Sequence, residues 1–224
     1  MKLLLKKLNT LFKFEEGKIN LLILEDAQLF LSTIEDLYAQ CNGECAHYIL
    51  SEEETEISFS KSIEMITDYI NLDLNDKRIM SKIMATLSKN AQDAEYYLLT
   101  NDIMAKVEKY LDNLEQSVSF PLTYKQMDIS ALLKSVSVKC EKIYDTMSEK
   151  IIYYMKVCSE FCKTKLFILI NLKLFLKKEE LIALYRDIVY NKFNVLLIET
   201  IEMKNIPDLE NVMIIDQSFC EIIY

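Results

Sequence analysis

The stretch that decides the fold reads KTKLFILINLKLFLKKEELIALYRDIVYNKFNVLLIET and runs from Lys163 to Thr200. It contains two short apolar runs, Leu166–Ile170 and Val195–Ile198, which are typical of parallel strands buried on both faces. The segment between them, residues 177–192, predicts an amphipathic helix. Its apolar face is formed by Leu181, Tyr185, Ile188 and Val189. Strand, helix and strand in this order predict a parallel crossover, the unit from which α/β sheets are built.

The turn after the first of these strands lacks what a nucleotide-binding fold needs. Such folds hold phosphates against a glycine-rich loop, but the turn from Asn171 to Leu174 contains no glycine. The whole chain has only two glycines, Gly17 and Gly43, and neither lies in a GxxxxGK[ST] or GxGxxG motif. We therefore do not expect an ATPase with a conventional phosphate loop.

The N-terminal region predicts another part of the same sheet. Residues 3–5, 11–14 and 19–24 are strand candidates. Asp26 is a predicted N-cap for the helix that follows, and Gly43, after Asn42, is predicted to end that helix. The side chains expected to face inward are Phe30, Ile34, Leu37 and Tyr38.

The middle of the chain has a helical pattern. Apolar spacing predicts a long helix over residues 75–114, a short helix at 129–136 and another helix over 146–162. The buried side of the last helix is expected to carry Met147, Ile151, Met155, Cys158 and Phe161. Because one small sheet cannot cover a helix as long as 75–114, we expect that helix to pack on another helix or another subunit.

These patterns define the expected fold class. It is an α/β head with a largely parallel sheet, discontinuous in sequence, plus an inserted extended α-helical leg domain. The head comprises residues 1–74 and 163–224, where a further strand is predicted at 212–215, and the leg comprises residues 75–162.

The charge distribution does not exclude nucleic-acid binding. The formal net charge is −9, but only two of the 26 basic residues are arginines, Arg78 and Arg186. Lysine-rich surfaces suit point-charge contacts to phosphate rather than bidentate reading of bases. The candidate DNA-contacting lysines are Lys134, Lys139, Lys163, Lys165, Lys173, Lys177 and Lys178. The alternative is that these lysines are ordinary solvated ends of elements.

The order of elements resembles a known family, the Csn-type accessory proteins of type II-A CRISPR systems, which assist spacer acquisition. The resemblance covers most of the chain. It is carried by SALLKSVSVKCEKIYDTMSEKI (130–151), KTKLFILINLKLFLKKEELIALY (163–185), NKFNVLLIE (191–199) and KINLLILEDAQLFLSTIEDLYAQCNGE (18–44). None of these is a catalytic signature, and their specificity lies in their order and spacing.

The resemblance implies a non-enzymatic protein that forms a homotetrameric ring. Rings of this family thread or cap the ends of double-stranded DNA through lysines on the inner surface, without reading sequence. The implied partners are DNA ends, further copies of the chain, the CRISPR integrase complex and the type II effector nuclease. A ring with an acidic outside and a basic lumen is compatible with an acidic chain.

The resemblance also implies calcium as a cofactor, but the matching carboxylates are few. Family members often bind calcium through several carboxylates before the short helix, whereas the corresponding segment 119–128 holds only Asp128. Calcium takes about 6 to 8 oxygen ligands, and Asp112 and Glu115 are the nearby candidates to supplement Asp128.

Two further constellations suggest other chemistry. Cys41, Cys45 and His47 form CxxxCxH and could supply three zinc ligands, or they are small side chains near a helix end. Asp26, Glu199 and Asp216 each follow a predicted strand, where open α/β sheets bind ligands. These acids support the alternative function, a small nucleotide- or metal-dependent α/β enzyme with an unconventional phosphate site.

The chain is expected to be cytoplasmic and to have no membrane partner. No apolar run approaches the roughly 20 residues of a membrane span. The six cysteines occur without a secretory signal, because Lys6 and Lys7 interrupt the apolar start, and they are therefore expected to be reduced thiols.

Overall fold

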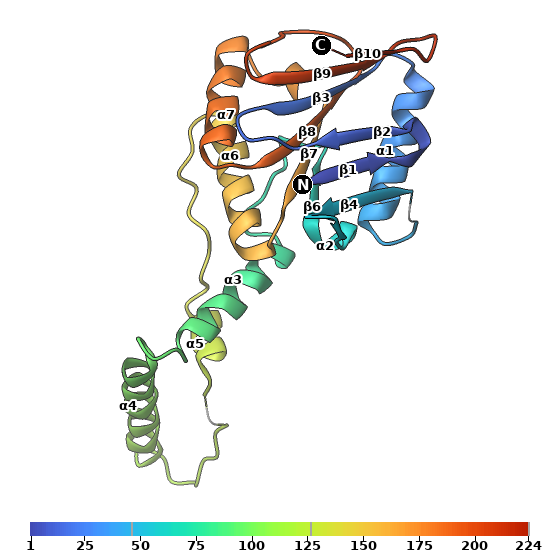
Figure 1. Ribbon diagram of the computed structural model, residues 1–224. Coiled ribbons are helices and arrows are strands. Elements are labelled where there is room, and N and C mark those ends of the chain that lie inside the picture. Colours follow the sequence, from blue (N-terminus) through green and yellow to red (C-terminus); the bar gives the residue numbers. More distant parts are fainter. Residues whose placement is uncertain (46, 126, 224) are drawn as a thin grey trace. The chain divides into compact units, whose positions relative to one another are not determined.

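The computed structural model describes residues 1–45, 47–125 and 127–223. Its contacts divide the chain into two compact units, one made of Met1–Asp73 and Ile143–Tyr224 and the other of Leu74–Lys142. The first is an α/β unit and the second is helical (Figure 1). We predicted that residues 143–162 belong to the helical part, whereas this division places them in the α/β unit.

The α/β unit contains two sheets. The larger has the strand order β10-β9-β3-β8-β7-β6, and the smaller has the order β2-β1-β4-β5. The strands of the larger sheet are β3 (Ile19–Leu24), β6 (Ile63–Ile66), β7 (Leu166–Ile170), β8 (Asn194–Glu199), β9 (Glu210–Ile215) and β10 (Glu221–Ile223). Those of the smaller are β1 (Lys2–Leu5), β2 (Thr10–Lys13), β4 (Tyr48–Glu52) and β5 (Thr55–Glu56).

The larger sheet is parallel except at one edge. β6, β7, β8, β3 and β9 pair in parallel, and only β10 is antiparallel to its neighbour β9. The register places Ile168 of β7 opposite Leu196 of β8. The predicted crossover is confirmed, because α7 (Lys178–Tyr190) connects these two paired strands.

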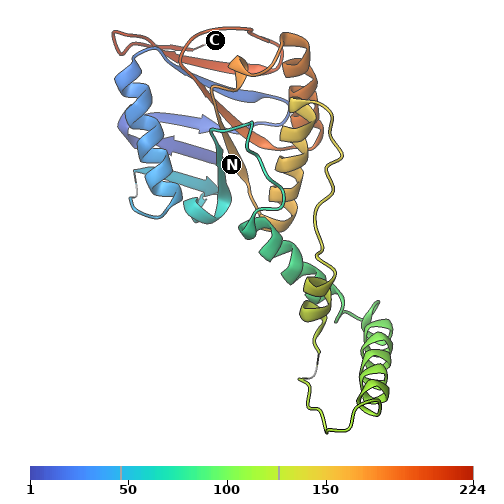
Figure 2. The ribbon, with the colours of Figure 1, turned by 180° about the vertical axis from the view of Figure 1, so that it is seen from behind.

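Alternate residues of the central strands face two different layers. In β7, Leu166, Ile168 and Ile170 join a core cluster with Leu3 and Leu50 of the smaller sheet. The residues between them are also buried. The strand period of two directs them to the opposite face, where α6 (Met147–Val157) and α7 stand side by side (Figure 1, Figure 2). This two-sided burial explains the continuous apolar runs that predicted the strands.

The N-terminal helix α1 (Ala27–Cys41) has the predicted limits. The Asp26 carboxylate accepts a hydrogen bond from Leu29 N (2.7 Å) and caps its start. Asn42 is its C-cap, and Gly43 follows with φ +80°, a left-handed conformation that glycine adopts without strain. One inward-facing residue was predicted wrongly, because Tyr38 is 62% exposed whereas Leu37 is buried.

The helix after residue 146 is capped by a reciprocal pair of hydrogen bonds. Glu149 N donates to Thr146 Oγ1 (3.2 Å), and Thr146 N donates to the Glu149 carboxylate (3.0 Å). Ile151 and Met155 are buried as predicted, and α6 contacts α7. A π-helical turn, Cys158–Cys162, continues α6 and ends at Lys163, whose φ is +62°.

The helical unit differs from the single long helix that we predicted for residues 75–114. It contains two helices, α3 (Lys77–Asn90) and α4 (Tyr97–Glu115), and the short α5 (Ile129–Ser135), which contacts α3. At the break, Asp93 O accepts from both Tyr96 N (3.0 Å) and Tyr97 N (2.9 Å). Asn and Asp favour such turns because their side chains compete with helical hydrogen bonding. No described residue of α4 is buried within the described chain.

Three short elements complete the described chain. They are α2 (Phe59–Ser62), the 3₁₀ turn Lys6–Leu8 and the 3₁₀ turn Leu172–Leu174. Strands β4, β5, β6 and β10 were not predicted from the sequence. Among the described helices, none combines the length and the hydropathy that crossing a membrane requires.

Candidate functional site

The position where a nucleotide-binding fold would hold phosphate is the turn after β7, residues 171–176, which we call the β7 turn. In this protein the turn is filled by the side chain of Glu199, the last residue of β8. Glu199 is 1% exposed, and its Oε1 accepts a hydrogen bond from Lys173 N (3.0 Å). A carboxylate of the chain therefore accepts the hydrogen bond of a backbone N–H group, and such groups bind phosphate in nucleotide sites.

A buried ion pair lies beside this contact. Lys173 Nζ is 2.6 Å from Glu210 Oε1, and both side chains have an exposed fraction of 0%. The Glu210 carboxylate also accepts from Tyr185 OH (2.7 Å) and from Ile206 N (2.9 Å). These donors satisfy a charge that would otherwise be costly to bury. The pair fixes the β7 turn to the start of β9.

A second lysine holds the same turn from outside the sheet. Lys204 Nζ donates to two carbonyls of the turn, Lys173 O (2.5 Å) and Leu176 O (2.7 Å). Tyr69 OH donates to Ile170 O (3.0 Å) at the end of β7. Both contacts satisfy carbonyls that the sheet ladder leaves without partners.

Burial perturbs the titration of this network. Desolvation raises the pKa of Glu199 to about 7, against the opposing effects of the Lys173 N–H bond and the Lys173 charge. Burial also raises the pKa of Tyr69 and Tyr185 well above the ordinary value, and the nearby carboxylates of Glu199 and Glu210 add to the increase. Glu199 is thus the group whose charge changes near neutral pH.

The other two strand-end acids have structural hydrogen bonds. Asp26 is the N-cap of α1. Asp216 Oδ1 accepts from Ser218 N and Cys220 N, both at 2.8 Å, and closes the turn before β10. Each of the three acids that we proposed for a nucleotide or magnesium site therefore binds backbone donors of its own chain.

The structure corrects one of the candidate DNA-contacting lysines. Lys173 cannot contact DNA in this conformation, because its side chain is fully buried in the pair with Glu210. The sequence did not indicate this role, since a lysine in a turn is usually solvated. The other six candidates are exposed.

The exposed candidates of the α/β unit lie at opposite ends of β7. Lys163 and Lys165 precede the strand, and Lys177 and Lys178 follow the turn after it. Lys165 forms an ion pair with Glu52. Neighbours in the sequence are therefore separated by the length of a strand and do not form one patch.

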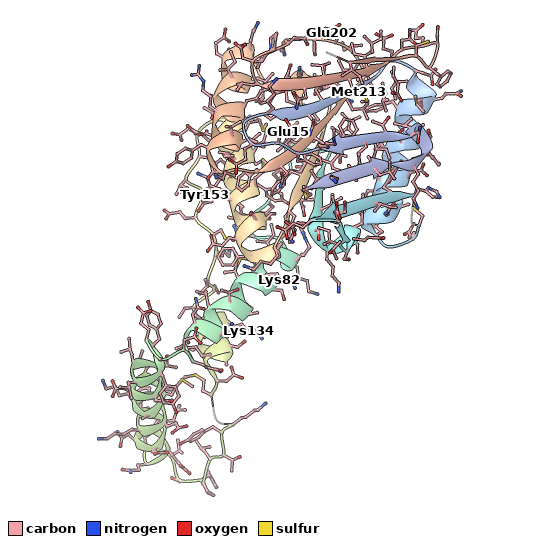
Figure 3. All side chains as sticks on the ribbon, in the orientation of Figure 1. Glu15, Lys82, Lys134, Tyr153, Glu202 and Met213 are labelled. Atoms are coloured by element: carbon pink, nitrogen blue, oxygen red, sulfur yellow. The ribbon has the colours of Figure 1, made fainter. Side chains whose placement is uncertain are left out.

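The remaining candidates belong to the helical unit. Lys134 lies on α5 (Figure 3), and together with Lys77 it borders a shallow groove of about 430 Å³ whose floor includes Met80 and Met84. Lys139 is exposed beyond the end of α5.

The calcium candidates are occupied by protein donors. Tyr124 OH donates to Asp112, which raises the pKa of Tyr124 to about 12. Glu115 accepts from Leu122 N (2.8 Å), and Asp128 accepts from Ala131 N (2.7 Å) as the N-cap of α5. Within residues 1–45, 47–125 and 127–223, no group of three or more Asp, Glu, His or Cys side chains could hold a metal ion.

That finding also applies to the zinc candidates near the end of α1. His47 Nδ1 lies 3.4 Å from Asp36 Oδ1, and Cys45 Sγ lies 3.6 Å from Asp36 O. Burial raises the pKa of the Cys41 thiol to about 11, and Glu64 and Cys45 contribute. A thiol with that pKa is protonated at neutral pH, whereas zinc binds the thiolate.

Comparison with known proteins identifies the family. The family model described as CRISPR-associated protein (Cas_Csn2) matches residues 40–219. The chain belongs to the Csn2 family. A CRISPR-associated protein Csn2 of Enterococcus faecalis is 23% identical over 198 residues, which cover 85% of this chain and 87% of that protein. Another, from Streptococcus agalactiae, is 23% identical over 194 residues, with 84% of each chain covered. Membership in the Csn2 family makes this a CRISPR-associated protein and assigns it to antiviral defence.

Two solved structures that resemble this Csn2-family chain do so only distantly. The structure of cbiO1 from Clostridium perfringens, part of the ABC transporter complex cbiONQ, is 12% identical with a TM-score of 0.47 and covers 92% of this chain and 76% of that one. The ADP conformation of MJ1267, an ATP-binding cassette, is 8% identical with a TM-score of 0.43, with 92% and 79% covered. TM-scores below 0.5 do not establish a shared fold.

Sequence reasoning missed most of the network around the β7 turn of this Csn2-family protein. Glu199 was singled out as a strand-end acid, but Glu210, Lys204 and Tyr69 were not. Glu210 is an acid at the first position of a strand, and Tyr185 was assigned to the apolar face of its helix. A buried lysine in a turn and a buried acid at the start of a strand give no periodic signal, because their pairing depends on the tertiary fold that brings the two segments together.

Proposed function

We propose that this chain is a non-enzymatic protein that binds the ends of double-stranded DNA without sequence preference and supports CRISPR spacer acquisition. Membership in the Csn2 family is the observation that carries the proposal. The expected partners within the CRISPR system are the integrase complex and the type II effector nuclease.

The exposed lysines supply the physical basis for DNA contact. In the part of the chain that the structure describes, Lys177 and Lys178 stand exposed at the start of α7, next to the β7 turn. Lysines of this kind neutralise phosphates and release counterions, an interaction that is independent of sequence. Lys134, Lys139 and Lys163 are exposed as well. These three lysines and Lys165 are the other members of the set that we propose for DNA contact.

The proposed assembly is a homotetrameric ring in which the helical unit acts as a leg. The described helix α4 leaves large apolar side chains such as Leu98 (80% exposed) uncovered within the chain. A helix gains most of its stability from burying an apolar face. A basic lumen inside an acidic assembly would accommodate DNA despite the net charge of −9.

Contacts within the described part of the chain count against the enzymatic alternative. A nucleotide-dependent enzyme requires free donors for phosphate at the carboxyl ends of the central strands. In this protein Glu199 accepts the Lys173 N–H, and Lys173 Nζ pairs with Glu210. Asp112, Glu115 and Asp128 each accept a hydrogen bond from the chain, and each carboxylate retains further acceptor sites for a cation.

The proposal is tested by gel shift on linear and small closed circular duplexes of the same sequence, together with a mass measurement in solution. We expect tight binding to linear duplex, loss of binding on closed circles, and a mass of four chains. Affinity should fall steeply with salt, because phosphate contacts dominate. A monomer that binds neither form, or equal binding to both forms, would contradict the proposal.

A further inference from the structure

The β7 turn is held by contacts that converge from one loop and one strand end. Asn171 N donates to Ile198 O (2.9 Å), Lys173 N donates to Glu199 Oε1 (3.0 Å), and Lys204 Nζ binds two carbonyls of the turn. The turn also contains buried Leu172 and Leu176. Its closed conformation therefore depends on the segment from Ile198 to Lys204.

Glu199 is the titratable group at the centre of these contacts. It is 1% exposed, so in the closed turn its charge is removed from water. The titratable and charged groups that interact with it come from five segments; they are Lys173, Lys204, Glu210, Tyr69 and Tyr185. Two ammonium groups favour its ionised form, and the Glu210 carboxylate opposes it.

We propose that the β7 turn is a pH-sensitive latch, in which protonated Glu199 favours the closed turn and ionised Glu199 favours an open turn that hydrates the carboxylate. The reason is linkage: a group that binds protons more tightly in one conformation draws the protein into that conformation as pH falls. Opening exposes Glu199 to water and removes the desolvation that burial imposes on its charge.

The size of the pH effect on the latch follows from the pKa of Glu199 in the closed turn and its pKa in water. In the closed turn the pKa of Glu199 is about 7, and in water the ordinary value is 4.5. With these values the ratio of open to closed turn rises about tenfold between pH 6 and pH 8. The sign is opposite to that of a carboxylate whose pKa is lowered by an ion pair.

The latch would also affect the positions of two lysine side chains. Lys177 and Lys178 follow the β7 turn directly and begin α7. Opening of the turn would loosen the start of this helix and the position of both ammonium groups. This consequence rests on the proposed function, but the latch itself does not.

The latch is tested by hydrogen exchange on the full-length protein in the absence of DNA. The amide of Lys173 reports on the turn directly, because it donates to Glu199. The amide of Glu25, which donates to Ile215 O (3.1 Å), serves as a control within the same sheet. After correction for intrinsic base catalysis, we expect the exchange of Lys173 to accelerate about tenfold from pH 6 to pH 8 and to be faster than that of Glu25 at each pH, because local opening of the turn costs less free energy than the global unfolding that exposes Glu25.

The variant Glu199→Gln keeps a hydrogen-bond acceptor but cannot titrate, so its Lys173 amide should show no corrected pH dependence. Asp216→Asn is the matched control, because it neutralises another strand-end acid and should retain the acceleration. A flat wild-type profile, or the same acceleration in Glu199→Gln, would overturn the latch. If Glu199→Gln does not fold, the exchange rates of the Lys173 and Glu25 amides in the wild type and in Asp216→Asn still test the latch.

Because this measurement contains no DNA, its result is independent of the proposed function. Loss of DNA binding with an intact latch would refute only the proposed function. A pH-insensitive turn in a protein that binds DNA ends would refute only the latch.

Discussion

The buried pair of Lys173 and Glu210 yields the most demanding prediction for stability. The two charges are 2.6 Å apart with no exposed side-chain surface, which corresponds to about 6 kcal/mol of attraction at an effective dielectric constant of about 20. Desolvation of both ions opposes this attraction. Removing one partner leaves the other charge buried and unpaired, so Lys173→Met should lower the free energy of unfolding by about 3 to 5 kcal/mol.

Removing both charges should restore most of that loss. Glu210→Gln keeps a carbonyl acceptor for Tyr185 OH or Ile206 N, while the double variant with Lys173→Met leaves no buried charge from this pair. We expect the double variant to lie within about 2 kcal/mol of wild type, closer than either single variant. Urea denaturation at pH 7.5 with linear extrapolation measures these differences.

Lys178→Met is the matched control, because the same change at an exposed lysine should alter stability by no more than about 0.5 kcal/mol. Additive losses in the double variant would refute the reasoning, since they would show that Lys173 and Glu210 contribute independently. A Lys173→Met loss as small as that of Lys178→Met would show that the charge of Glu210 is not buried in solution.

Three further predictions follow from other parts of the structure. The folded pKa of Glu199, about 7, exceeds its ordinary value of 4.5; the folded state therefore takes up a proton between these values, and stability should fall by about 3 kcal/mol as pH rises from 4.5 through 7. Glu199→Gln should remove that part of the pH dependence, and parallel denaturation profiles would contradict the assignment. Thr146→Ala should cost about 1 kcal/mol through loss of the N-cap of α6, measured by thermal unfolding, and an unchanged stability would argue against the cap. Replacing both Lys177 and Lys178 by alanine should reduce the slope of log affinity for linear duplex against log salt by about 2 for each subunit whose two lysines contact phosphate, whereas an unchanged slope would exclude both from phosphate contact.

The central strands of the larger sheet could be predicted because burial on both faces leaves a continuous apolar signal. Ile19–Leu24 and Leu166–Ile170 match β3 and β7 residue for residue. The edge strand β6 (IEMI) and the hairpin β4–β5 gave weaker signals, because polar residues interrupt them. Their assignment depends on pairing with partners distant in sequence.

Helix limits were predictable where a cap decided them. Asp26 accepts the capping hydrogen bond expected of it, and the helix predicted from residue 146 is capped by Thr146. The break at residues 91–96 was missed because the apolar spacing on either side of it continues in register, while the turn is formed by local hydrogen bonds of Asp93. Periodicity reports which face is apolar and does not report whether the backbone is continuous.

The candidate site was the least predictable part. Lysines were grouped by their proximity in sequence, but β7 separates Lys165 from Lys177, and the fold buries Lys173. Whether a lysine is solvated depends on whether a carboxylate from another loop reaches it. In this chain Glu210, 37 positions after Lys173, provides that carboxylate.

The distance between the two ends of β7, where exposed lysines lie, determines how many base pairs of DNA a single subunit could cover. From Lys165 to Asn171 the extended backbone spans roughly 20 Å at ~3.3 Å per residue. B-form duplex advances 3.4 Å per base pair along its axis, so that span corresponds to about six base pairs. A single subunit that engaged one duplex with both ends of β7 would thus contact phosphates about half a helical turn apart along the duplex axis.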